Sequence, residues 1–108
     1  MDGAVILHLA LRSDWEAAKA AGEYPWSTRG ITVADEGYTH CSFEHQWPGV
    51  RERFYADLDD SDLVLLEIDE SLLSGAVVVE RIGNAPDEFP HIYGTIDIAA
   101  VVGERPVM

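Results

Sequence analysis

The sequence predicts one α+β domain over residues 1–108, with two main helices and a sheet of mixed or antiparallel strands. The chain has 108 residues, which is the length of an ordinary single domain. Hydrophobic residues make up 47% of it, enough to build a core without disulfides. Two helical patterns come early and most strand-like runs come late, an order typical of the α+β class.

The first two elements are a buried strand and an amphipathic helix. Residues 4–10 are almost wholly apolar, which predicts a central strand covered on both faces, with His8 as its one polar residue. Residues 13–16 (Ser-Asp-Trp-Glu) match a capping box, so we expect a helix that starts there and stops at Gly22. The side chains expected to face the core from this helix are Trp15, Ala18 and Ala21.

The middle of the chain predicts an irregular loop, a second strand and a second helix. Residues 23–37 lack a clear period apart from a short strand at 31–33, and a loop this long in a small domain is usually functional. Residues 38–43 predict a strand, and Ser42 would cap a helix over about 44–56. In that helix Arg51 and Arg53 would face solvent. Its apolar stripe would consist of Trp47, Val50 and Phe54, with Tyr55 beside them.

The second half predicts strands joined by turns. Residues 57–62 form an acidic turn that lacks the ligand series of a calcium loop. A single helical turn is expected at 69–75. The strands are expected at 63–68, 76–82, 89–94 and from about 97 to near Pro106.

The charge of the chain restricts its partners. There are 20 acidic and 7 basic residues, a net charge of −13, and the basic residues are scattered. Nucleic acids and anionic membranes require a cationic surface, so we expect neither as a partner. A small anionic ligand remains compatible, because a helix N-terminus and one arginine can hold a phosphate locally. The oligomeric state is left open.

Cysteine content and hydropathy predict a cytoplasmic protein. A single cysteine cannot form an internal disulfide, which fits a reducing compartment. The start Met1-Asp2-Gly3-Ala4 is acidic and does not resemble a signal peptide. The apolar runs are shorter than the roughly 18 residues that a membrane-spanning helix needs.

Three histidines lie on expected strands, namely His8, His40 and His91. Burying several imidazoles is costly unless each finds partners, so a shared polar pocket is the economical explanation. The alternative, in which each is a hydrogen-bonded core residue, stays open. His45, at a helix start, is expected at the surface.

Strand alternation decides which neighbours act together. It places Tyr38, His40 and Ser42 on one face and Cys41 on the other. Spacing fits none of the usual zinc patterns, so no metal site is expected. A nucleophilic Cys41 with His40 as base is disfavoured for the same geometric reason. Ser42 at a helix start would add backbone N–H donors for a phosphate or carboxylate.

The chain resembles the bacterial family catalogued as domain of unknown function 952 over nearly its whole length. The resemblance rests on the segments 6–12, 14–15, 37–42, 53–55, 63–69 and 89–94, in that order. The family is similar in turn to the ADP-ribosyltransferase-like fold, which binds NAD across a split sheet. The resemblance implies that this chain binds NAD or a related nucleotide and is an ADP-ribosyltransferase-like enzyme. The alternative is a non-catalytic binding or regulatory module with structural histidines.

The resemblance also implies roles for individual residues. His8 fits the position that contacts the adenosine ribose, and His40 or Ser42 fits the position near the nicotinamide. The third polar position falls to His91, Tyr93 or Glu80, because the usual acidic residue has no clear counterpart. The implied catalytic residues are His40 and His91, and the implied cofactor-binding residues are His8, Ser42, Tyr93 and Arg12.

Overall fold

The computed structural model describes residues 4–107, which form an α+β domain with three helices and antiparallel sheets. The expected α+β class is confirmed, whereas the option of a mixed sheet is wrong because every strand pair within residues 4–107 is antiparallel. Residues 1–3 of the acidic start lie outside the described part. The helices are α1 (Arg12–Ala21), α2 (Val33–Glu36) and α3 (Trp47–Phe54). The strands are β1 (Val5–Leu11), β2 (Trp26–Thr28), β3 (Ile31–Thr32), β4 (Thr39–His40), β5 (Leu63–Asp69), β6 (Ala76–Glu80), β7 (Phe89–Tyr93) and β8 (Val101–Arg105).

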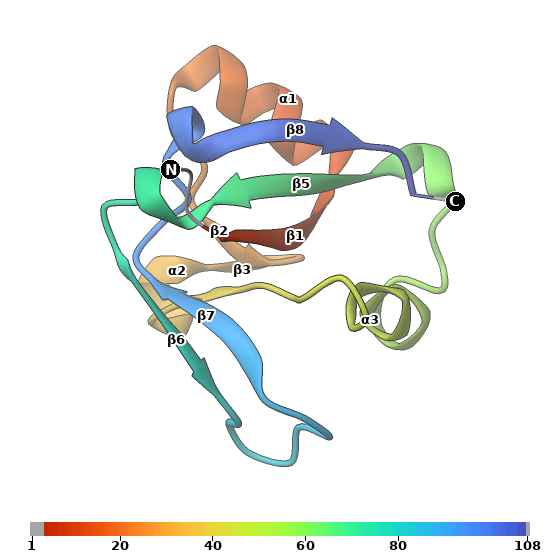
Figure 1. Cartoon of the computed structure of the whole chain (residues 1–108). Coiled ribbons are helices and arrows are strands. Elements are labelled where there is room, and N and C mark those ends of the chain that lie inside the picture. The colour runs from red at the N-terminus through yellow and green to blue at the C-terminus, as the bar shows by residue number, and fades with distance from the viewer. Residues whose placement is uncertain (1–3, 108) are drawn as a thin grey trace.

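The strands divide into a sheet β1-β5-β8, a sheet β4-β7-β6 and a small β2-β3 pair (Figure 1). Short 3₁₀ turns at Asp60–Asp62, Glu70–Leu72 and Ile98–Ala100 lead into or out of these strands. The two larger sheets meet where Leu7 of β1 pairs with Ser42, just after β4. The β6–β7 hairpin extends away from the first sheet (Figure 1). The space between the sheets is therefore bounded by β1, by β4 and by this hairpin.

Strands β1 and β5 of the first sheet are buried on both faces, which explains their apolar sequences, whereas β8 alternates between exposed and half-buried residues. Ile6 and Ala10 of β1 pack in one cluster with Trp15 of α1. Leu7 and Leu9, which alternate with them, pack in a second cluster beside α3. The predicted buried strands at 4–10 and 63–68 are thus confirmed, but the middle strand of this sheet is β5 and not β1, which was expected to be central.

Helix α1 ends as predicted but starts differently. Gly22 adopts the left-handed conformation at φ 81° and terminates the helix. The helix starts at Arg12, with Leu11 as its N-cap and without a side-chain cap bond. The predicted capping box at 13–16 is wrong, because the chain passes from β1 directly into the helix. Trp15 is buried as expected, whereas Ala21 is exposed.

The strand and helix predicted at 38–56 are both shorter than expected. Only Thr39–His40 forms β4, and Ser42 exchanges backbone hydrogen bonds of 2.7 and 2.8 Å with Leu7. The Ser42 N–H therefore donates to Leu7 and does not begin a helix, and α3 starts at Trp47 after Gln46. The expectation that Ser42 caps this helix is wrong.

Two side chains of α3 also depart from the predicted pattern. Phe54 is 62% exposed, and Tyr55, at 2%, takes the core position instead. Arg51 does not face solvent, because its guanidinium donates to the carbonyls of Tyr55 and Leu58 and to Asp60. It closes the C-terminal end of α3, where the last carbonyls need donors.

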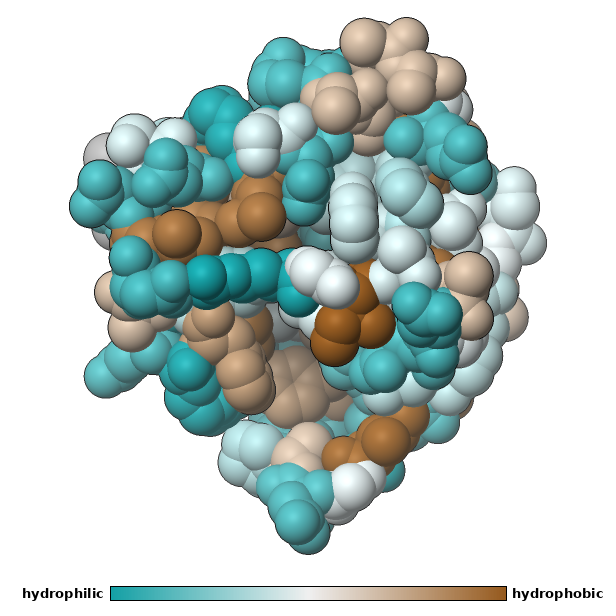
Figure 2. Space-filling view, turned by 180° about the vertical axis from the view of Figure 1, so that it is seen from behind, coloured by the Kyte–Doolittle hydropathy of each residue, from teal (hydrophilic) through white to brown (hydrophobic). Residues whose placement is uncertain are grey.

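The surface combines hydrophilic side chains with separate apolar patches, as the face in Figure 2 shows. Exposed apolar side chains occur on several elements, among them Val5, Val79 and Val102. Within residues 4–107, no helix has the length and apolar character needed to cross a membrane.

Candidate functional site

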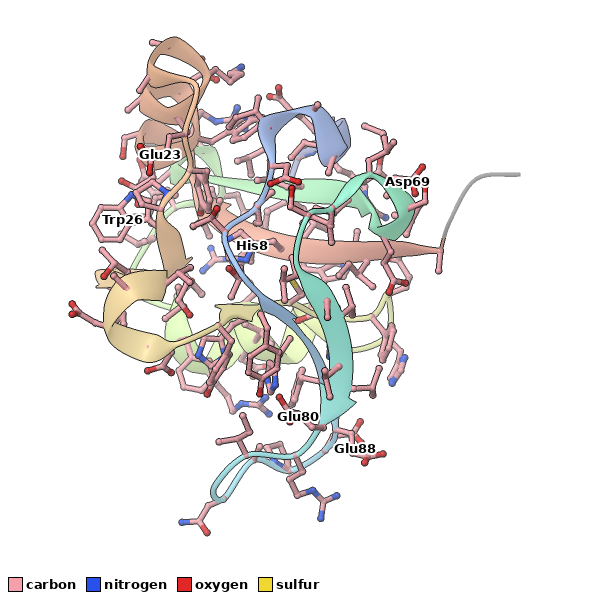
Figure 3. All side chains as sticks on the ribbon, turned by 90° about the vertical axis from the view of Figure 1, so that its left-hand side faces the viewer. His8, Glu23, Trp26, Asp69, Glu80 and Glu88 are labelled. Atoms are coloured by element: carbon pink, nitrogen blue, oxygen red, sulfur yellow. The ribbon has the colours of Figure 1, made fainter. Side chains whose placement is uncertain are left out.

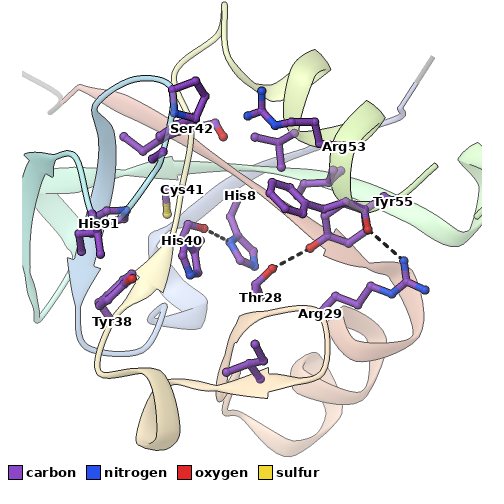
Figure 4. A pocket seen from close by; sticks show the side chains of 18 of the residues that line it. His8, Thr28, Arg29, Tyr38, His40, Cys41, Ser42, Arg53, Tyr55 and His91 are labelled. Carbon is purple, nitrogen blue, oxygen red and sulfur yellow. Dashed lines mark hydrogen bonds between the residues drawn. The ribbon is translucent and has the colours of Figure 1, made fainter. Parts of the chain in front are cut away.

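A cavity of about 650 Å³ lies between the two larger sheets, next to α3 and the β6–β7 loop (Figure 4). Its size falls in the range of small-molecule sites. Four of the predicted site residues line it: His8, His40, Ser42 and His91. The other polar side chains in its wall belong to Thr28, Arg29, Tyr38, Arg53, Tyr55 and Asn84. Apolar walls come from residues such as Ile31, Phe54, Ile82, Pro86 and Phe89.

His8 lies in the interior of the molecule (Figure 3), where it lines the cavity, and both of its ring nitrogens are hydrogen-bonded. Nδ1–H donates to the carbonyl oxygen of His40 at 2.6 Å, and Nε2 accepts from the Tyr24 hydroxyl at 2.9 Å. Burial lowers the pKa of His8 from 6.5 to about 4, so the ring is neutral at pH 7. His8 therefore fixes the strand that carries His40 and has no ring nitrogen left for a ligand.

His40 and His91 lie side by side in the cavity wall, on paired strands. Their Cα atoms are register partners, and the ring centroids are 5.6 Å apart. His40 Nε2 and Glu36 Oε1 are 2.9 Å apart, as are His91 Nδ1 and Glu80 Oε2. Each imidazole is therefore oriented by its own carboxylate through one nitrogen, which leaves the other nitrogen for a ligand.

Tyr38 lies against both histidines. Its ring centroid is 4.9 Å from that of His40 and 4.6 Å from that of His91. Burial raises the pKa of the Tyr38 hydroxyl, and the nearby carboxylate of Glu36 adds to the effect. The phenol is thus a neutral aromatic wall suited to stacking against a planar ring.

Tyr93 and Glu80 lie behind His91 rather than in the cavity wall. The Tyr93 hydroxyl donates to the Glu80 carboxylate that also binds His91. The hydrogen bond from Tyr93, and then that from His91, lowers the pKa of Glu80 and keeps it ionised. Tyr93, expected among the cofactor-binding residues, is therefore placed to support His91 indirectly.

Arg12 is not brought to the cavity. Its guanidinium donates to the carbonyl oxygens of Ser61 at 3.2 Å and Leu63 at 3.1 Å, at the start of β5. The implied cofactor-binding role does not fit this placement, because α1 starts immediately at Arg12 and turns the side chain toward β5.

Cys41, expected on the opposite face from His40 and Ser42, is buried in the core but also lines the cavity. Burial raises the pKa of its thiol strongly, so the thiol is protonated at neutral pH. Among residues 4–107, no group of three or more His, Cys, Asp or Glu side chains is arranged to hold a metal ion.

Sequence reasoning missed the arginines of the cavity. Arg29 comes from the irregular loop predicted at 23–37, and Arg53, expected to face solvent, is exposed but also lines the cavity. Both line the cavity on the side of α3. No local pattern distinguished these two arginines from the other basic residues, and only the fold shows which arginines share a cavity.

Comparison with known proteins identifies relatives without an assigned activity. Residues 9–104 match the family described as Protein of unknown function (DUF952). The crystal structure of protein CC0527 from Caulobacter crescentus is similar, with a TM-score of 0.78 and 23% identity over 97% of this chain and 87% of that one. A double mutant of the same protein gives a TM-score of 0.78 at 22% identity. No protein among the curated sequences matches significantly.

Proposed function

The chain belongs to the DUF952 family, and we propose that it binds NAD or a related nucleotide in the cavity between its two sheets. We further propose that it acts as an ADP-ribosyltransferase-like enzyme through His40 and His91. The fold likeness to that group is part of the proposal. It is supported by the division of the strands into two antiparallel sheets that meet at Leu7 and Ser42.

The observation that carries the proposal is the charge of the cavity wall. The chain has 20 acidic residues, yet none of those within residues 4–107 lines the cavity. Two of its 7 basic residues and three of its 4 histidines do. The acidic residues elsewhere in the chain repel an anion at long range. A cavity wall that has basic side chains and no carboxylates offsets this repulsion locally and so favours an anionic ligand.

The aromatic part of the wall supports a ligand with a planar ring. Tyr38 and the two imidazoles beside it offer flat surfaces, and Ile31, Phe54 and Phe89 add apolar area. Most small-molecule sites combine such apolar area with a few polar groups that set orientation. A nucleotide has both the ring and the negative charge.

His40 and His91 are the side chains placed to move protons. Each donates one N–H to a carboxylate, so the opposite nitrogen can accept a proton from an acceptor substrate as nicotinamide leaves. Carboxylate-bound imidazoles hold one orientation, which such a transfer requires. Ser42 contributes its hydroxyl to the same wall, and His8 holds His40 in place.

A non-catalytic binding module is the second candidate. It is favoured by His8, whose two hydrogen bonds show that one of the three histidines is a structural core residue. The two candidates share the cavity and differ only in whether His40 and His91 act on the bound ligand.

Calorimetric titration with NAD, together with chromatographic detection of nicotinamide, tests both candidates. We expect NAD to bind and nicotinamide to be released, with release lost in His40→Ala and in His91→Ala. His45→Ala is the matched control, because His45 is 73% exposed and does not line the cavity. Binding without nicotinamide release would favour the second candidate. An absence of heat at millimolar NAD would reject nucleotide binding.

A further inference from the structure

Arg53 is an exposed arginine that lines the cavity, and its guanidinium has no hydrogen-bond or ion-pair partner among residues 4–107. Its guanidinium carbon lies 5.6 Å from the centroid of the Phe54 ring. Most other basic side chains of the chain are engaged. Those that make hydrogen bonds or ion pairs are Arg12, Lys19, Arg29, Arg51 and Arg105. Among residues 4–107, Arg53 and Arg81 have no such bond, and of these two only Arg53 lines the cavity.

The second cavity arginine, Arg29, cannot offer the same charge. Its two terminal nitrogens donate to the two carboxylate oxygens of Asp57 at 2.7 and 2.6 Å. It also donates to the carbonyl oxygen of Phe54 at 3.1 Å. The ion pair neutralises Arg29, and its position fixes the end of α3, next to Arg53. One free guanidinium thus remains in the wall.

The free guanidinium and the histidines occupy different sides of the cavity. Figure 4 shows Arg53 and Tyr55 on the α3 side, and Tyr38 and His91 across the cavity from them. The wall is therefore divided into a cationic side and an aromatic side. A ligand that uses both sides must carry its negative group and its planar ring at different ends.

We infer that Arg53 binds a phosphate of the ligand, while the planar ring of the ligand lies against Tyr38 and His91. The inference rests on the proposed function and defines its substrate class as phosphorylated nucleosides rather than free nucleosides or bases. A planar guanidinium donates two parallel N–H groups to two phosphate oxygens, which a lysine cannot reproduce. Arg53 is thus the residue that sets specificity for the phosphate.

The test compares ligands and variants by calorimetric titration at fixed ionic strength. NAD and AMP carry phosphate, and adenosine does not. The variants are Arg53→Gln, which removes the charge, Arg53→Lys, which keeps it, and the control Arg81→Gln. Arg81 is the matched control because it is exposed and does not line the cavity. Thermal unfolding of each variant checks that the fold is kept.

We expect wild-type protein to bind NAD and AMP more tightly than adenosine. Arg53→Gln should bind both phosphorylated ligands at least about tenfold more weakly and adenosine unchanged, as expected for the loss of a charged hydrogen bond. Arg53→Lys should recover part of the affinity, and Arg81→Gln should match wild type.

Three outcomes would overturn the inference. Unchanged NAD and AMP binding by Arg53→Gln would reject the role of Arg53 and leave nucleotide binding intact. An equal loss in Arg81→Gln would show a general charge effect instead of a site. If wild-type protein binds neither NAD nor AMP, the proposed function and this inference fail together.

Discussion

His40 and His91 face each other across a strand pair and are held by opposite ring nitrogens. Their ring planes are 86° apart, and their Cα atoms are partners in the β4–β7 register. Glu36 binds Nε2 of His40, whereas Glu80 binds Nδ1 of His91. The nitrogens left for a ligand are consequently Nδ1 of His40 and Nε2 of His91, which are chemically distinct positions.

The first prediction is that the neutral forms of these two imidazoles are opposite tautomers. The hydrogen bond to each carboxylate fixes the proton on the bonded nitrogen. Two-bond ¹H–¹⁵N NMR spectra at alkaline pH should show Nε2–H for His40 and Nδ1–H for His91. In Glu80→Gln the Nδ1–H preference of His91 should weaken, while His40 remains unchanged. Two identical tautomers in wild-type protein would contradict the arrangement.

The second prediction concerns His8 and the loss of stability in weak acid. The folded-state pKa of His8 is about 4, below the 6.5 of the free side chain, because the ring is buried. As the pH falls below about 6.5, His8 is protonated in the unfolded chain but stays neutral in the folded chain. The free energy of unfolding therefore declines until about pH 4, below which His8 is protonated in both states. From pH 7 to pH 5, His8 should lower the free energy of unfolding by about 2 kcal/mol.

Urea denaturation of wild-type protein and His8→Gln at pH 7 and pH 5 measures this contribution. Other groups titrate in the same pH range, but they are present in both proteins. Their contribution cancels when the unfolding free energy of the variant is subtracted from that of the wild type. The wild type should lose about 2 kcal/mol more than the variant between these pH values. Equal losses of unfolding free energy in the two proteins would show that His8 has the same pKa in the folded and unfolded states.

The third prediction concerns Tyr24, whose hydroxyl donates to His8 Nε2 in the core. Tyr24→Phe keeps the ring and its edge contact with His8, and removes only the donor. A buried acceptor left without a donor costs about 1–3 kcal/mol of unfolding free energy. Tyr93→Phe is the control, because the Tyr93 ring is 43% exposed and water can replace its hydroxyl. Equal effects of the two substitutions would argue against a buried hydrogen bond.

Much of this architecture followed from periodicity, because buried strands and helix stops have local causes. The apolar run at 4–10 is covered on both faces, and Gly22 ends α1 through its left-handed conformation. Local signals failed where a distant segment competed for the same groups. Ser42 does not cap α3, because β1 takes its backbone N–H across more than thirty residues of sequence.

The cavity was predictable only in part for the same reason. Three histidines on strands suggested a shared pocket, and all three line one. Which of them is free for a ligand depended on Tyr24, Glu36 and Glu80, whose contacts arise from tertiary packing. Arg53 is exposed, as expected, but helix periodicity cannot show that its side chain also lines a cavity built by distant segments.

The fourth prediction is that Cys41 is protected from thiol reagents in the native protein. The side chain is 4% exposed, and burial raises the pKa of the thiol, so little thiolate is present. Iodoacetamide should modify Cys41 at a rate limited by opening of the fold, and urea should accelerate it. Rapid alkylation of the native protein, with loss of ligand binding, would instead support the reading of Cys41 as a reactive nucleophile.

The fifth prediction concerns Gln46, which ties the β6–β7 loop to the start of α3. Gln46 is 7% exposed, and its side-chain amide donates to the Asp87 carboxylate at 3.1 Å and to the Glu88 carbonyl at 2.7 Å. Its own carbonyl accepts from the Phe43 N–H at 2.9 Å. Residues 82 and 84–86 of the same loop form one wall of the cavity, so this glutamine holds that wall closed.

Gln46→Glu replaces both donors with a carboxylate that faces Asp87. Loss of the bonds and the added repulsion should lower the unfolding free energy by about 1–3 kcal/mol. Hydrogen exchange at residues 82–88 should accelerate more than exchange in β5, because the loop opens while the first sheet stays formed. His45→Ala is the control, since His45 lies 3.9 Å from the same carboxylate and is largely exposed. Equal hydrogen-exchange protection of residues 82–88 in Gln46→Glu and wild type would mean that the loop keeps its conformation without the Gln46 hydrogen bonds.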